Sequence, residues 1–506
     1  MHRDGVLIID FGGQYTQLIA RRVREACVYC EIHPCHDPRI DRTVRAVILS
    51  GGPASVAEEG APRLPAGVVE AGVPVLGICY GLQLLADALG GEVGRSALRE
   101  YGPARLRVHA ASRLLDGFPP ESTVWMSHGD SVTALPRGFA SVATTTEGSV
   151  AVVEDVEGRL FGVQFHPEVV HTEAGTRLFE NFLFRIARLP ADWSMASFLE
   201  ETGAALAARV GDRPILCAVS GGVDSTVLAR LIARAAPKSL VAVFVDTGLL
   251  RKGESDEVSA LFADLPFHRI DASARFLARL RGVADPEAKR RAIGDEFIKV
   301  FAEFARSLPG EPFLAQGTLY PDVIESVSVR GPSAVIKTHH NVGGLPKELP
   351  FPLIEPFREL FKDEVRALGR LLGVPERVLS RHPFPGPGLA VRILGEVTDE
   401  GLAVLRDCDA IFVEGLRASG LYDLVWQAFA VLLPVRSVGV MGDGRTYESV
   451  VALRAVTSRD GMTADWARLP HEFLARVSSR IVNEVPRVNR VVYDVSSKPP
   501  STIEWE

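Results

Sequence analysis

Residues 73–85 read VPVLGICYGLQLL, an apolar run that leads into a cysteine with Gly77 two places before it and Gly81 two places after it. This G-x-C-x-G spacing is the nucleophile-elbow pattern, with sulfur in place of a serine oxygen. A strand-to-helix turn tight enough to expose residue 79 leaves no room for side chains at 77 and 81. A position at the start of a helix also favours thiolate over thiol. We therefore predict that Cys79 is a nucleophile, because a buried structural cysteine would not need this bend.

A nucleophile needs a base, and the stretch GVQFHPE supplies His166, with Glu168 two residues further on. On extended backbone, residues i and i+2 face the same way, and Pro167 stiffens the piece between them, so that the carboxylate can orient the imidazole. The glycines of SGGP, among them Gly52, follow a strand pattern and can present a backbone N–H as part of an oxyanion hole. Although an isolated histidine is more often simply packed, these features together predict a catalytic site.

Outward from the elbow, residues 5–190 alternate short apolar strand patterns with helical ones. In chain order the stretches are GVLIIDF, QLIARRVREA, AVILSGGP, VPVLGI and LQLLADAL. Such alternation predicts a mainly parallel sheet with helices on both faces. Residues 104–165 show only strand patterns, which predicts an added antiparallel part. A helical stretch, TRLFENFLFRIARL, closes this first domain at Pro190.

The rest of the chain predicts two further domains. Strands PILCAVS and SLVAVFVD, each followed by a helix, indicate a second doubly wound α/β domain, in which the Gly- and Pro-rich stretch 327–352 favours a lid. The last part predicts a small α+β domain, with a strand LAVRILGEV and helices over 399–432. The predicted fold class is therefore α/β, with two doubly wound, mainly parallel-sheet domains over 1–190 and 191–381 and a small α+β domain over 382–506.

Length and composition exclude several classes of protein. At 506 residues the chain is too long for one core, so about two to four domains are expected. A net charge of -7 disfavours nucleic acid as a partner. No apolar run is long enough to span a membrane, and the apolar N-terminal stretch is too short for a signal sequence, so we expect no membrane association and a cytoplasmic location. The 6 cysteines do not make a disulfide framework.

One cysteine-rich stretch raises the question of a zinc site. Residues 27–36 read CVYCEIHPCH, which offers C-x-x-C with two histidines close by. No second C-x-x-C or H-x-x-x-H follows to complete four ligands, and Val28, Tyr29 and Ile32 favour a strand. We therefore predict no zinc.

Two loops have the composition of phosphate sites. VSGGVDST, at 219–226, lies between a buried strand and a helix, where glycines let the backbone approach a phosphate and the helix start offers unpaired N–H groups. It lacks the Walker lysine and has the pyrophosphatase-loop form S-G-G-x-D-S, in which Asp224 can help to hold magnesium; the alternative is a helix cap with a tight turn. The second loop, GVMGDGRT at 439–446, lies between two strand patterns, and Asp443-Gly444 is a hairpin signal.

These motifs together resemble a known family. GICYGLQ, with SGGP upstream and HPE downstream, resembles the class I glutamine amidotransferases. Joined to SGGVDST, FVDTGLLR, GTLYPDVIES, IKTHHNVGGLP, HPFPGPGL, MGDGRTYE and KPPSTIEWE, it resembles the glutamine-hydrolysing GMP synthetase family along essentially the whole chain. The departures are small: Leu82 and Thr226 stand where methionine and serine are commoner, and 326–333 follows the family loosely.

The resemblance implies a two-part reaction. A cysteine attacks the glutamine side-chain amide, forms a thioester and releases ammonia. ATP adenylates the O2 of xanthosine monophosphate with release of pyrophosphate, and ammonia displaces AMP to give GMP. It also implies Mg²⁺, ATP as co-substrate, and a homodimer formed through the C-terminal domain.

The resemblance further assigns roles to individual positions. It implies a catalytic triad of Cys79, His166 and Glu168; oxyanion and glutamine-binding residues Gly52, Tyr80, Gln83, Ser127 and His128; ATP-binding residues Ser220, Gly221, Gly222, Val223, Asp224, Ser225, Thr226, Val245 and Lys337; substrate-binding residues Arg290, Lys498 and Glu504; and metal-binding residues Asp224, Asp322 and Glu325.

Two alternatives remain beside this interpretation. One is another ATP pyrophosphatase with the same loop, such as a glutamine-dependent NAD synthetase or a tRNA-thiolating enzyme. Sulfur transfer generally requires paired cysteines, and after residue 190 only Cys217 and Cys408 remain, so nitrogen transfer is favoured. The other is a silent nucleotide-sensing scaffold, which would be expected to lack Cys79, His166 or Asp224.

Overall fold

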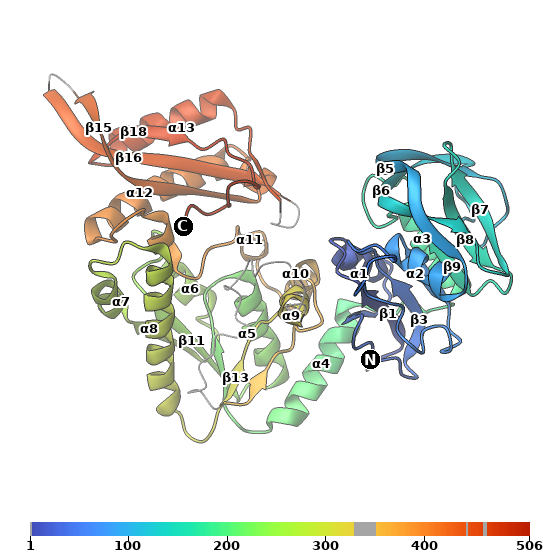
Figure 1. Ribbon diagram of the computed structural model, residues 1–506. Coiled ribbons are helices and arrows are strands. Elements are labelled where there is room, and N and C mark those ends of the chain that lie inside the picture. The colour runs from blue at the N-terminus through green and yellow to red at the C-terminus, as the bar shows by residue number, and fades with distance from the viewer. Residues whose placement is uncertain (1–2, 328–350, 442–443, 459–462) are drawn as a thin grey trace. The chain divides into compact units, whose positions relative to one another are not determined.

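The computed structural model describes residues 3–327, 351–441, 444–458 and 463–506 (Figure 1). Lys337, Asp443 and most of the predicted lid lie outside these residues. The described chain falls into two compact units, which we take one at a time. The first gathers the described residues of Met1–Phe198, Leu319–Val342 and Glu359–Phe361, and the second those of Leu199–Thr318, Gly343–Arg358 and Lys362–Glu506.

The first unit is built on a mixed sheet whose strand order is β2-β1-β3-β4-β9-β8-β7-β5-β6. The five strands from β2 to β9 in this order pair in parallel, and the remaining pairs are antiparallel. The strands are β1 (Gly5–Asp10), β2 (Cys30–Pro34), β3 (Val44–Leu49), β4 (Val75–Ile78), β5 (Glu92–Val108), β6 (Glu121–Ala134), β7 (Phe139–Thr145), β8 (Val150–Asp155) and β9 (Leu160–Val163). The predicted parallel core with an added antiparallel part is confirmed.

Helices cover both faces of the parallel part. Because successive strand residues point to opposite faces, Ile8 of β1 packs in one buried cluster with Ile19 of a helix on one side, and Leu7 packs in another with Leu84 of a helix on the other. The helical elements are α1 (Thr16–Glu25), α2 (Tyr80–Ala88), α3 (Gly175–Glu180), a π-helical turn η1 (Asn181–Ile186), the start of α4 (Met195–Val210), and α9 (Tyr320–Val327).

The second unit contains a fully parallel sheet with strand order β12-β11-β10-β13-β14. Its strands are β10 (Ile215–Ala218), β11 (Leu240–Asp246), β12 (Phe267–Asp271), β13 (Phe313–Ala315) and β14 (Leu353–Ile354). Its helices are α5 (Val223–Ala235), α6 (Glu254–Leu261), α7 (Ser273–Leu280), α8 (Pro286–Arg306), α10 (Lys362–Leu371) and α11 (Glu376–Leu379). The prediction of a second doubly wound α/β fold is confirmed.

A second, mainly antiparallel sheet completes this unit. In it β15 pairs with β16 and β16 with β17 in antiparallel fashion, while β18 runs parallel to β16. The elements are η2 (Gly388–Arg392), α12 (Asp399–Ala418), η3 (Tyr422–Leu424), β15 (Gln427–Met441), β16 (Gly444–Thr457), β17 (Asp465–Trp466), α13 (His471–Glu484) and β18 (Val488–Tyr493). The pairing of Met441 with Gly444 confirms that the second phosphate-like loop is a hairpin.

Two sequence predictions in this region were wrong. The stretch LAVRILGEV is not a strand, because Leu389 to Arg392 form a 3-10 helix in which every side chain is buried. Helix α12 also ends at Ala418, and after the short 3-10 helix η3 the chain is a strand and not a helix up to 432, since the segment from Gln427 pairs with β16. In both places the run is apolar throughout because it is buried on all sides. Its sequence therefore lacks the alternation of apolar and polar residues by which a helix can be told from a strand.

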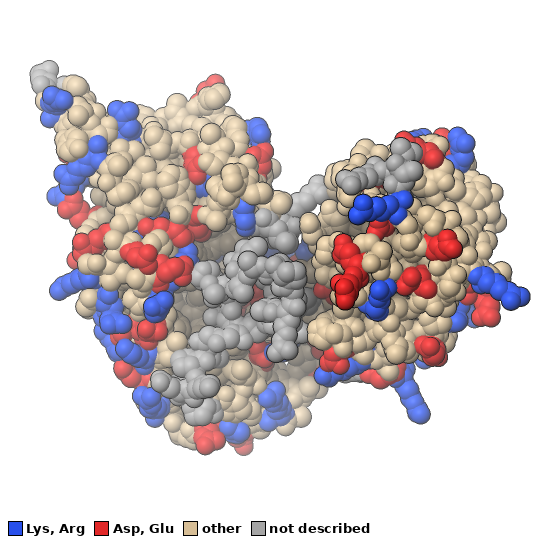
Figure 2. All heavy atoms as spheres, viewed as in Figure 1, with Lys and Arg blue, Asp and Glu red and all other residues tan. Residues whose placement is uncertain are grey.

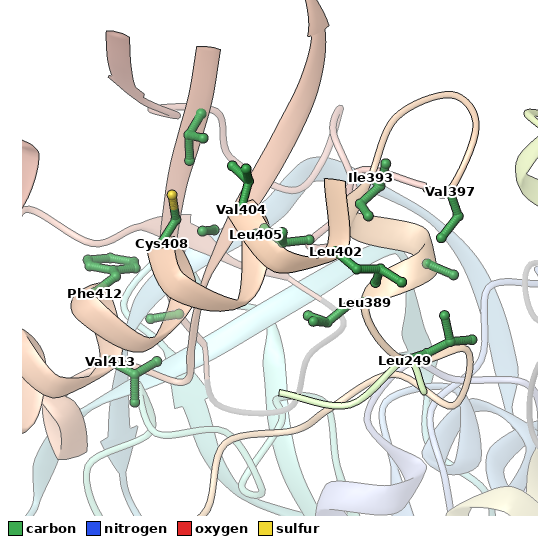
Figure 3. Packing of buried hydrophobic residues seen from close by; sticks show 14 of the residues in the cluster. Leu249, Leu389, Ile393, Val397, Leu402, Val404, Leu405, Cys408, Phe412 and Val413 are labelled. Atoms are coloured by element: carbon green, nitrogen blue, oxygen red, sulfur yellow. The ribbon is translucent and has the colours of Figure 1, made fainter. Parts of the chain in front are cut away.

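One hydrophobic cluster joins the two sheets of the second unit. Figure 3 shows Leu402, Leu405 and Phe412 of α12 in this cluster, with Leu389 and Leu249 near the Leu402 end of the helix. The same cluster reaches the parallel sheet through Leu216 and Val243, the antiparallel sheet through Ala428 and Val451, and helix α13 through Phe473. This shared core explains why 199–318 and 362–506 form one compact unit, while the domain boundaries at 190 and 381 remain predictions.

Replacing Gly81 with alanine should destabilise the first unit. A Cβ at Gly81 would lie 2.4 Å from the Leu49 carbonyl oxygen, so the start of α2 or the end of β3 would have to move. We expect a loss of about 1–3 kcal/mol, measured by urea unfolding. The control is Gly294→Ala in α8, where a Cβ meets nothing within 4 Å and alanine should add about 1 kcal/mol through helix propensity. An unchanged midpoint for Gly81→Ala would contradict the close approach.

Candidate functional site

Cys79 lies at the bend between β4 and α2. It is the N-cap residue of α2, with φ 51° and ψ -105°, a conformation that residues other than glycine rarely adopt. A Cβ at Gly77 would lie 2.6 Å from the Gly81 backbone, so both flanking positions require glycine. The Cys79 N–H donates to the Val163 carbonyl oxygen at 2.7 Å, which ties the bend to β9. The local geometry is that of a nucleophile elbow.

The Cys79 sulfur is surrounded by polar groups. The residue is 5% exposed, less than the elbow pattern predicts. The Sγ atom lies 3.8 Å from the Ser127 carbonyl oxygen and 3.8 Å from Nε2 of Gln164, and it makes a side-chain hydrogen bond with His166. Cys79 packs within a buried hydrophobic cluster of the first unit, but its sulfur has hydrogen-bonding partners and is not enclosed by hydrocarbon alone.

His166 and Glu168 form the buried pair that their spacing predicts. Nδ1 of His166 lies 2.6 Å from Oε1 of Glu168, and the residues are 5% and 1% exposed. Burial by itself lowers the pKa of His166, but the Glu168 carboxylate and the Cys79 sulfur outweigh it and raise this pKa to about 10. At neutral pH the His166 imidazole is therefore the positively charged imidazolium, and it lies beside the sulfur.

The glycines after β3 lie against this pair. A Cβ at Gly51 would be 3.0 Å from Cε1 of His166 and 3.7 Å from Cβ of Cys79. Gly52 packs against Tyr80, because a Cβ there would lie 3.1 Å from the Tyr80 ring. The Tyr80 hydroxyl donates to the Pro62 carbonyl oxygen at 2.7 Å. The structure thus brings the predicted oxyanion residues Gly52 and Tyr80 beside Cys79.

The predicted glutamine-binding residues lie on α2 and β6. Nε2 of Gln83 donates to the Asp130 carbonyl oxygen at 2.8 Å, and the exposed Ser127 turns its own carbonyl oxygen toward the sulfur. The buried His128 imidazole pairs with Glu100 at 3.3 Å. Burial lowers the pKa of His128, against the opposing effect of the Glu100 carboxylate.

Sequence reasoning missed Gln164. This residue is fully buried, and its amide nitrogen faces the sulfur while its Oε1 has no hydrogen-bond partner. Residues two positions apart on extended backbone face the same way, and this rule predicts that Glu168 lies beside His166. It predicts the same for Gln164, two positions before His166, so the signal was present in the sequence.

The predicted pyrophosphate loop occupies the turn between β10 and α5. Gly221 has φ +73°, and a Cβ there would lie 2.5 Å from Cγ2 of Val258. Ser220 N–H donates to Oγ of Ser225 at 3.1 Å, and Oγ1 of Thr226 donates to the Gly222 carbonyl oxygen at 2.7 Å. The backbone of the loop therefore runs directly into the N-terminus of α5, a 13-residue helix. The unpaired N–H groups at a helix N-terminus bind anions.

Val245 lies in the neighbouring strand β11, next to the strand that leads into this loop. It is 5% exposed and pairs with Ile270 of β12. The loop begins beside β11, since Val219 N–H donates to the Val243 carbonyl oxygen at 2.9 Å.

A lysine that the loop motif lacks is supplied by α10. Nζ of Lys362 lies 2.5 Å from Oδ2 of Asp224. No motif connects these residues, which are 138 positions apart, so the sequence offered no signal for the pair. The other oxygen of Asp224, Oδ1, is buried and has no hydrogen-bond partner among the residues that the structure describes.

This free oxygen fits a magnesium ion shared with phosphates. Mg²⁺ is commonly held by one or two carboxylates together with substrate phosphate oxygens. Among the described residues no group of three or more His, Cys, Asp or Glu side chains could hold a metal by itself. Asp322 lies on α9 in the first unit, where its Oδ2 accepts from the Leu319 N–H at 3.3 Å. Glu325 is on the same helix, and its side chain, like Lys337, lies outside the part that the structure describes.

The predicted substrate residues meet at the end of the chain. Glu504 accepts two hydrogen bonds from Arg392, at 3.1 and 2.8 Å, and one from Gln427 at 2.7 Å. The Arg290 guanidinium donates to the Glu506 carbonyl oxygen. Lys498 pairs its backbone with Ala464. Arg392 and Gln427 were missed, because nothing near them in sequence indicates a partner more than 70 residues away.

In the described part of the chain, no helix is both long and apolar enough to cross a membrane.

Two protein families match parts of the chain. The family described as Glutamine amidotransferase class-I matches residues 7–186, and the family described as GMP synthase C terminal domain matches residues 414–505. The first match contains the Cys79 elbow, and the second contains Lys498 and Glu504.

Curated relatives match along the whole length. A protein named GMP synthase (glutamine-hydrolyzing) from Nitratidesulfovibrio vulgaris strain Miyazaki F is 59% identical over 509 residues, which cover 99% of this chain and 99% of the relative. A protein of the same name from Symbiobacterium thermophilum is 58% identical over 512 residues, which cover 100% of this chain and 99% of the relative.

Replacing Glu168 with glutamine should remove a stability contribution that depends on pH. The pKa of His166 in the folded protein, about 10, lies above its ordinary value in an unfolded chain. The stabilisation of the fold by the protonated imidazole is therefore fully present below about pH 6.5 and is lost as the pH rises through 10. We expect a melting temperature about 4 °C below wild type at pH 6.5, and a smaller deficit near pH 10.

Differential scanning calorimetry over this pH range measures the effect. The control is Glu180→Gln, at a half-exposed carboxylate that pairs with Arg177, whose deficit should be near zero throughout. A deficit for Glu168→Gln that does not change with pH would show that the carboxylate does not act through His166.

Proposed function

We propose, since this chain belongs to the glutamine-hydrolysing GMP synthase family, that its two compact units carry the two halves of one reaction. The enzyme makes GMP from xanthosine monophosphate, with nitrogen from glutamine and energy from ATP. The observation that carries the proposal for the first half is the buried contact of 2.6 Å between His166 and Glu168 beside the Cys79 sulfur.

In the first unit, the Cys79 sulfur, whose proton has passed to His166, attacks the side-chain amide carbon of glutamine. Backbone N–H groups near Gly52 and Tyr80 stabilise the negative charge on the amide oxygen. His166, protonated at neutral pH, gives its proton to the leaving nitrogen, so that ammonia departs and a thioester remains. His166 then takes a proton from water as the water attacks the thioester, and glutamate leaves. Gln83, Ser127 and His128 hold the substrate.

In the second unit, residues 220–226 hold the pyrophosphate part of ATP, and Val245 lies beside it. Loop N–H groups and hydroxyls, together with Lys362, bind the charge that develops on pyrophosphate when the purine oxygen is adenylated. We propose that Asp224 holds Mg²⁺, with Asp322 and Glu325 as further ligands and Lys337 at ATP. When bound, Mg²⁺ neutralises charge on the phosphate oxygens.

Arg290, Lys498 and Glu504 are proposed to hold the nucleotide substrate. The support is that Glu504 and Arg290 converge on one short segment in the second unit. The domain boundaries proposed above, 1–190, 191–381 and 382–506, separate glutamine hydrolysis, ATP binding and nucleotide binding.

We also propose a homodimer formed through residues 382–506. Four apolar side chains on the β15–β16 hairpin are unusually exposed, and such clusters favour a protein partner. They are Val435, Val438, Val440 and Tyr447, at 52%, 45%, 77% and 60% exposed. Figure 2 shows acidic and basic side chains interspersed on the visible face of each unit, a pattern unlike the basic patches of nucleic-acid-binding proteins. A cytoplasmic location and the absence of zinc remain predictions.

Replacing Cys79 with alanine should abolish GMP synthesis from glutamine and leave synthesis from ammonium salts intact. The reason is that ammonia bypasses the thioester. The measurement is GMP formation with each nitrogen source, and Cys27→Ala, at an exposed cysteine, is the control that should retain both. Equal loss with glutamine and with ammonium would refute the division of labour.

Asp224→Asn and Lys362→Met should each slow AMP formation about 100-fold and spare glutamine hydrolysis. Both changes act on charge at the pyrophosphate loop, whereas the glutaminase site lies in the other unit. AMP release from ATP, xanthosine monophosphate and ammonium, and glutamate release from glutamine, measure the two halves. Lys252→Met, which removes an exposed lysine paired with Asp407, is the matched control. Normal adenylation in either test variant would remove that residue from the loop.

A further inference from the structure

In the described part of the second unit three cations are fully buried, and all three bind the same short segment. Lys289 on α8, Arg392 on η2 and Arg454 on β16 each have a side-chain exposure of 0%. Their carboxylate partners are Glu506, Glu504 and Asp494, respectively. We call residues 494–506 the tail. A buried cation is costly unless it is paired, so each of the three requires the tail to be in place.

Lys289 is the most unusual of the three, because lysine is almost never fully buried. Its Nζ donates to the Ala390 and Ile393 carbonyl oxygens at 3.2 and 2.6 Å and to Oε2 of Glu506 at 2.6 Å. All three donors of the ammonium group are therefore used, and among the described residues the charge that compensates Lys289 comes from Glu506.

Arg454 holds the tail mainly through its backbone. It donates to the carbonyl oxygens of Ser496, Thr502 and Ile503 at 3.1, 2.9 and 2.8 Å and to Oδ2 of Asp494 at 2.7 Å. Arg392 fixes the carboxylate of Glu504 in a two-pronged contact, and its guanidinium lies 4.1 Å from the centre of the Phe429 ring.

Regular structure contributes little to the position of the tail. No helix or strand is assigned in 494–506, and the backbone of the tail bonds to the rest of the unit through the bridge between Lys498 and Ala464 and through the Asp494 N–H, which donates to the Leu453 carbonyl oxygen at 3.0 Å. An irregular segment with so few backbone bonds depends on side-chain contacts for a defined path. The buried cations supply those contacts at both ends of the tail.

We propose that Lys289, Arg392 and Arg454 are positioning residues, which hold the tail so that Lys498 and Glu504 face the nucleotide substrate. This inference rests on the proposed function of Lys498 and Glu504 as substrate contacts. Lys289 binds Glu506 and contacts neither Lys498 nor Glu504 in the hydrogen bonds described. We therefore expect a substitution of Lys289 to change substrate binding only by moving the tail.

The test compares Lys289→Met and Glu506→Gln with wild-type enzyme under saturating ammonium. We expect the KM for xanthosine monophosphate to rise about tenfold in both, while the KM for ATP and the glutaminase rate stay within about twofold. Amide hydrogen exchange in 494–506 should become faster in both variants. The Glu506→Gln variant is the milder one, because it leaves Lys289 its two carbonyl acceptors, and it keeps the test open if Lys289→Met does not fold.

Asp409→Asn is the matched control for a general loss of stability. Asp409 is 2% exposed and pairs with Arg251 at 3.2 Å in the same unit, and the hydrogen bonds described for these two residues do not include the tail. It should lower the melting temperature and leave the KM for xanthosine monophosphate unchanged. An equal rise in that KM in the control would mean that instability, and not tail position, explains the result.

The variant Glu504→Gln tests the substrate role of Glu504 directly, and so it distinguishes failure of that role from failure of the positioning role of Lys289. If Glu504→Gln raises the KM for xanthosine monophosphate but Lys289→Met and Glu506→Gln leave it within twofold, the positioning inference is overturned and the substrate role of Glu504 stands. If Glu504→Gln itself leaves this KM unchanged, the proposed substrate role fails. Unchanged hydrogen exchange of the tail in Lys289→Met would also overturn the inference.

Discussion

The start of α2 approaches the end of β3 so closely that only glycine fits at position 81. A Cβ there would lie 2.4 Å from a strand carbonyl oxygen, and a Cβ at Gly77 would meet the first turn of the helix. The residue between them, Cys79, is forced to a positive φ, at a cost of about 1–3 kcal/mol that the buried strands around it must offset. This backbone constraint holds the sulfur against Ser127 of β6 and against the segment that follows β9, where Gln164 and His166 meet it.

Both units place their charged groups at the carboxyl ends of parallel strands, where open α/β sheets bind ligands. They stabilise charge by different means. In the first unit a buried carboxylate, Glu168, keeps a proton on His166. In the second, backbone N–H groups at the start of α5 and a lysine from α10 surround the loop that contains Asp224. The first arrangement suits proton transfer at a covalent intermediate, and the second suits a polyanion that must be held and released.

The tail of the second unit shows a third way of fixing a functional segment. Glu504 is oriented by a buried guanidinium and Glu506 by a buried ammonium group, although their backbone has no strand or helix assigned. Buried ion pairs seldom add much net stability, because desolvation offsets their attraction. They do penalise every arrangement that leaves a charge unpaired, and so they define one path for an irregular chain.

The sequence by itself determined the features that depend on close neighbours along the chain. The glycine spacing around Cys79, the i, i+2 relation of His166 and Glu168 and the strand-loop-helix order at 215–226 are local, because sterics and backbone hydrogen bonds act over a few residues. Only the tertiary structure decided that Lys362 lies at Asp224, 138 positions away, and that Lys289 binds Glu506, 217 positions away. It also decided that the apolar run after Gly388 is a 3-10 helix. Such pairs and buried segments depend on which elements pack together, and a charge or an apolar run carries no local mark of its distant neighbour.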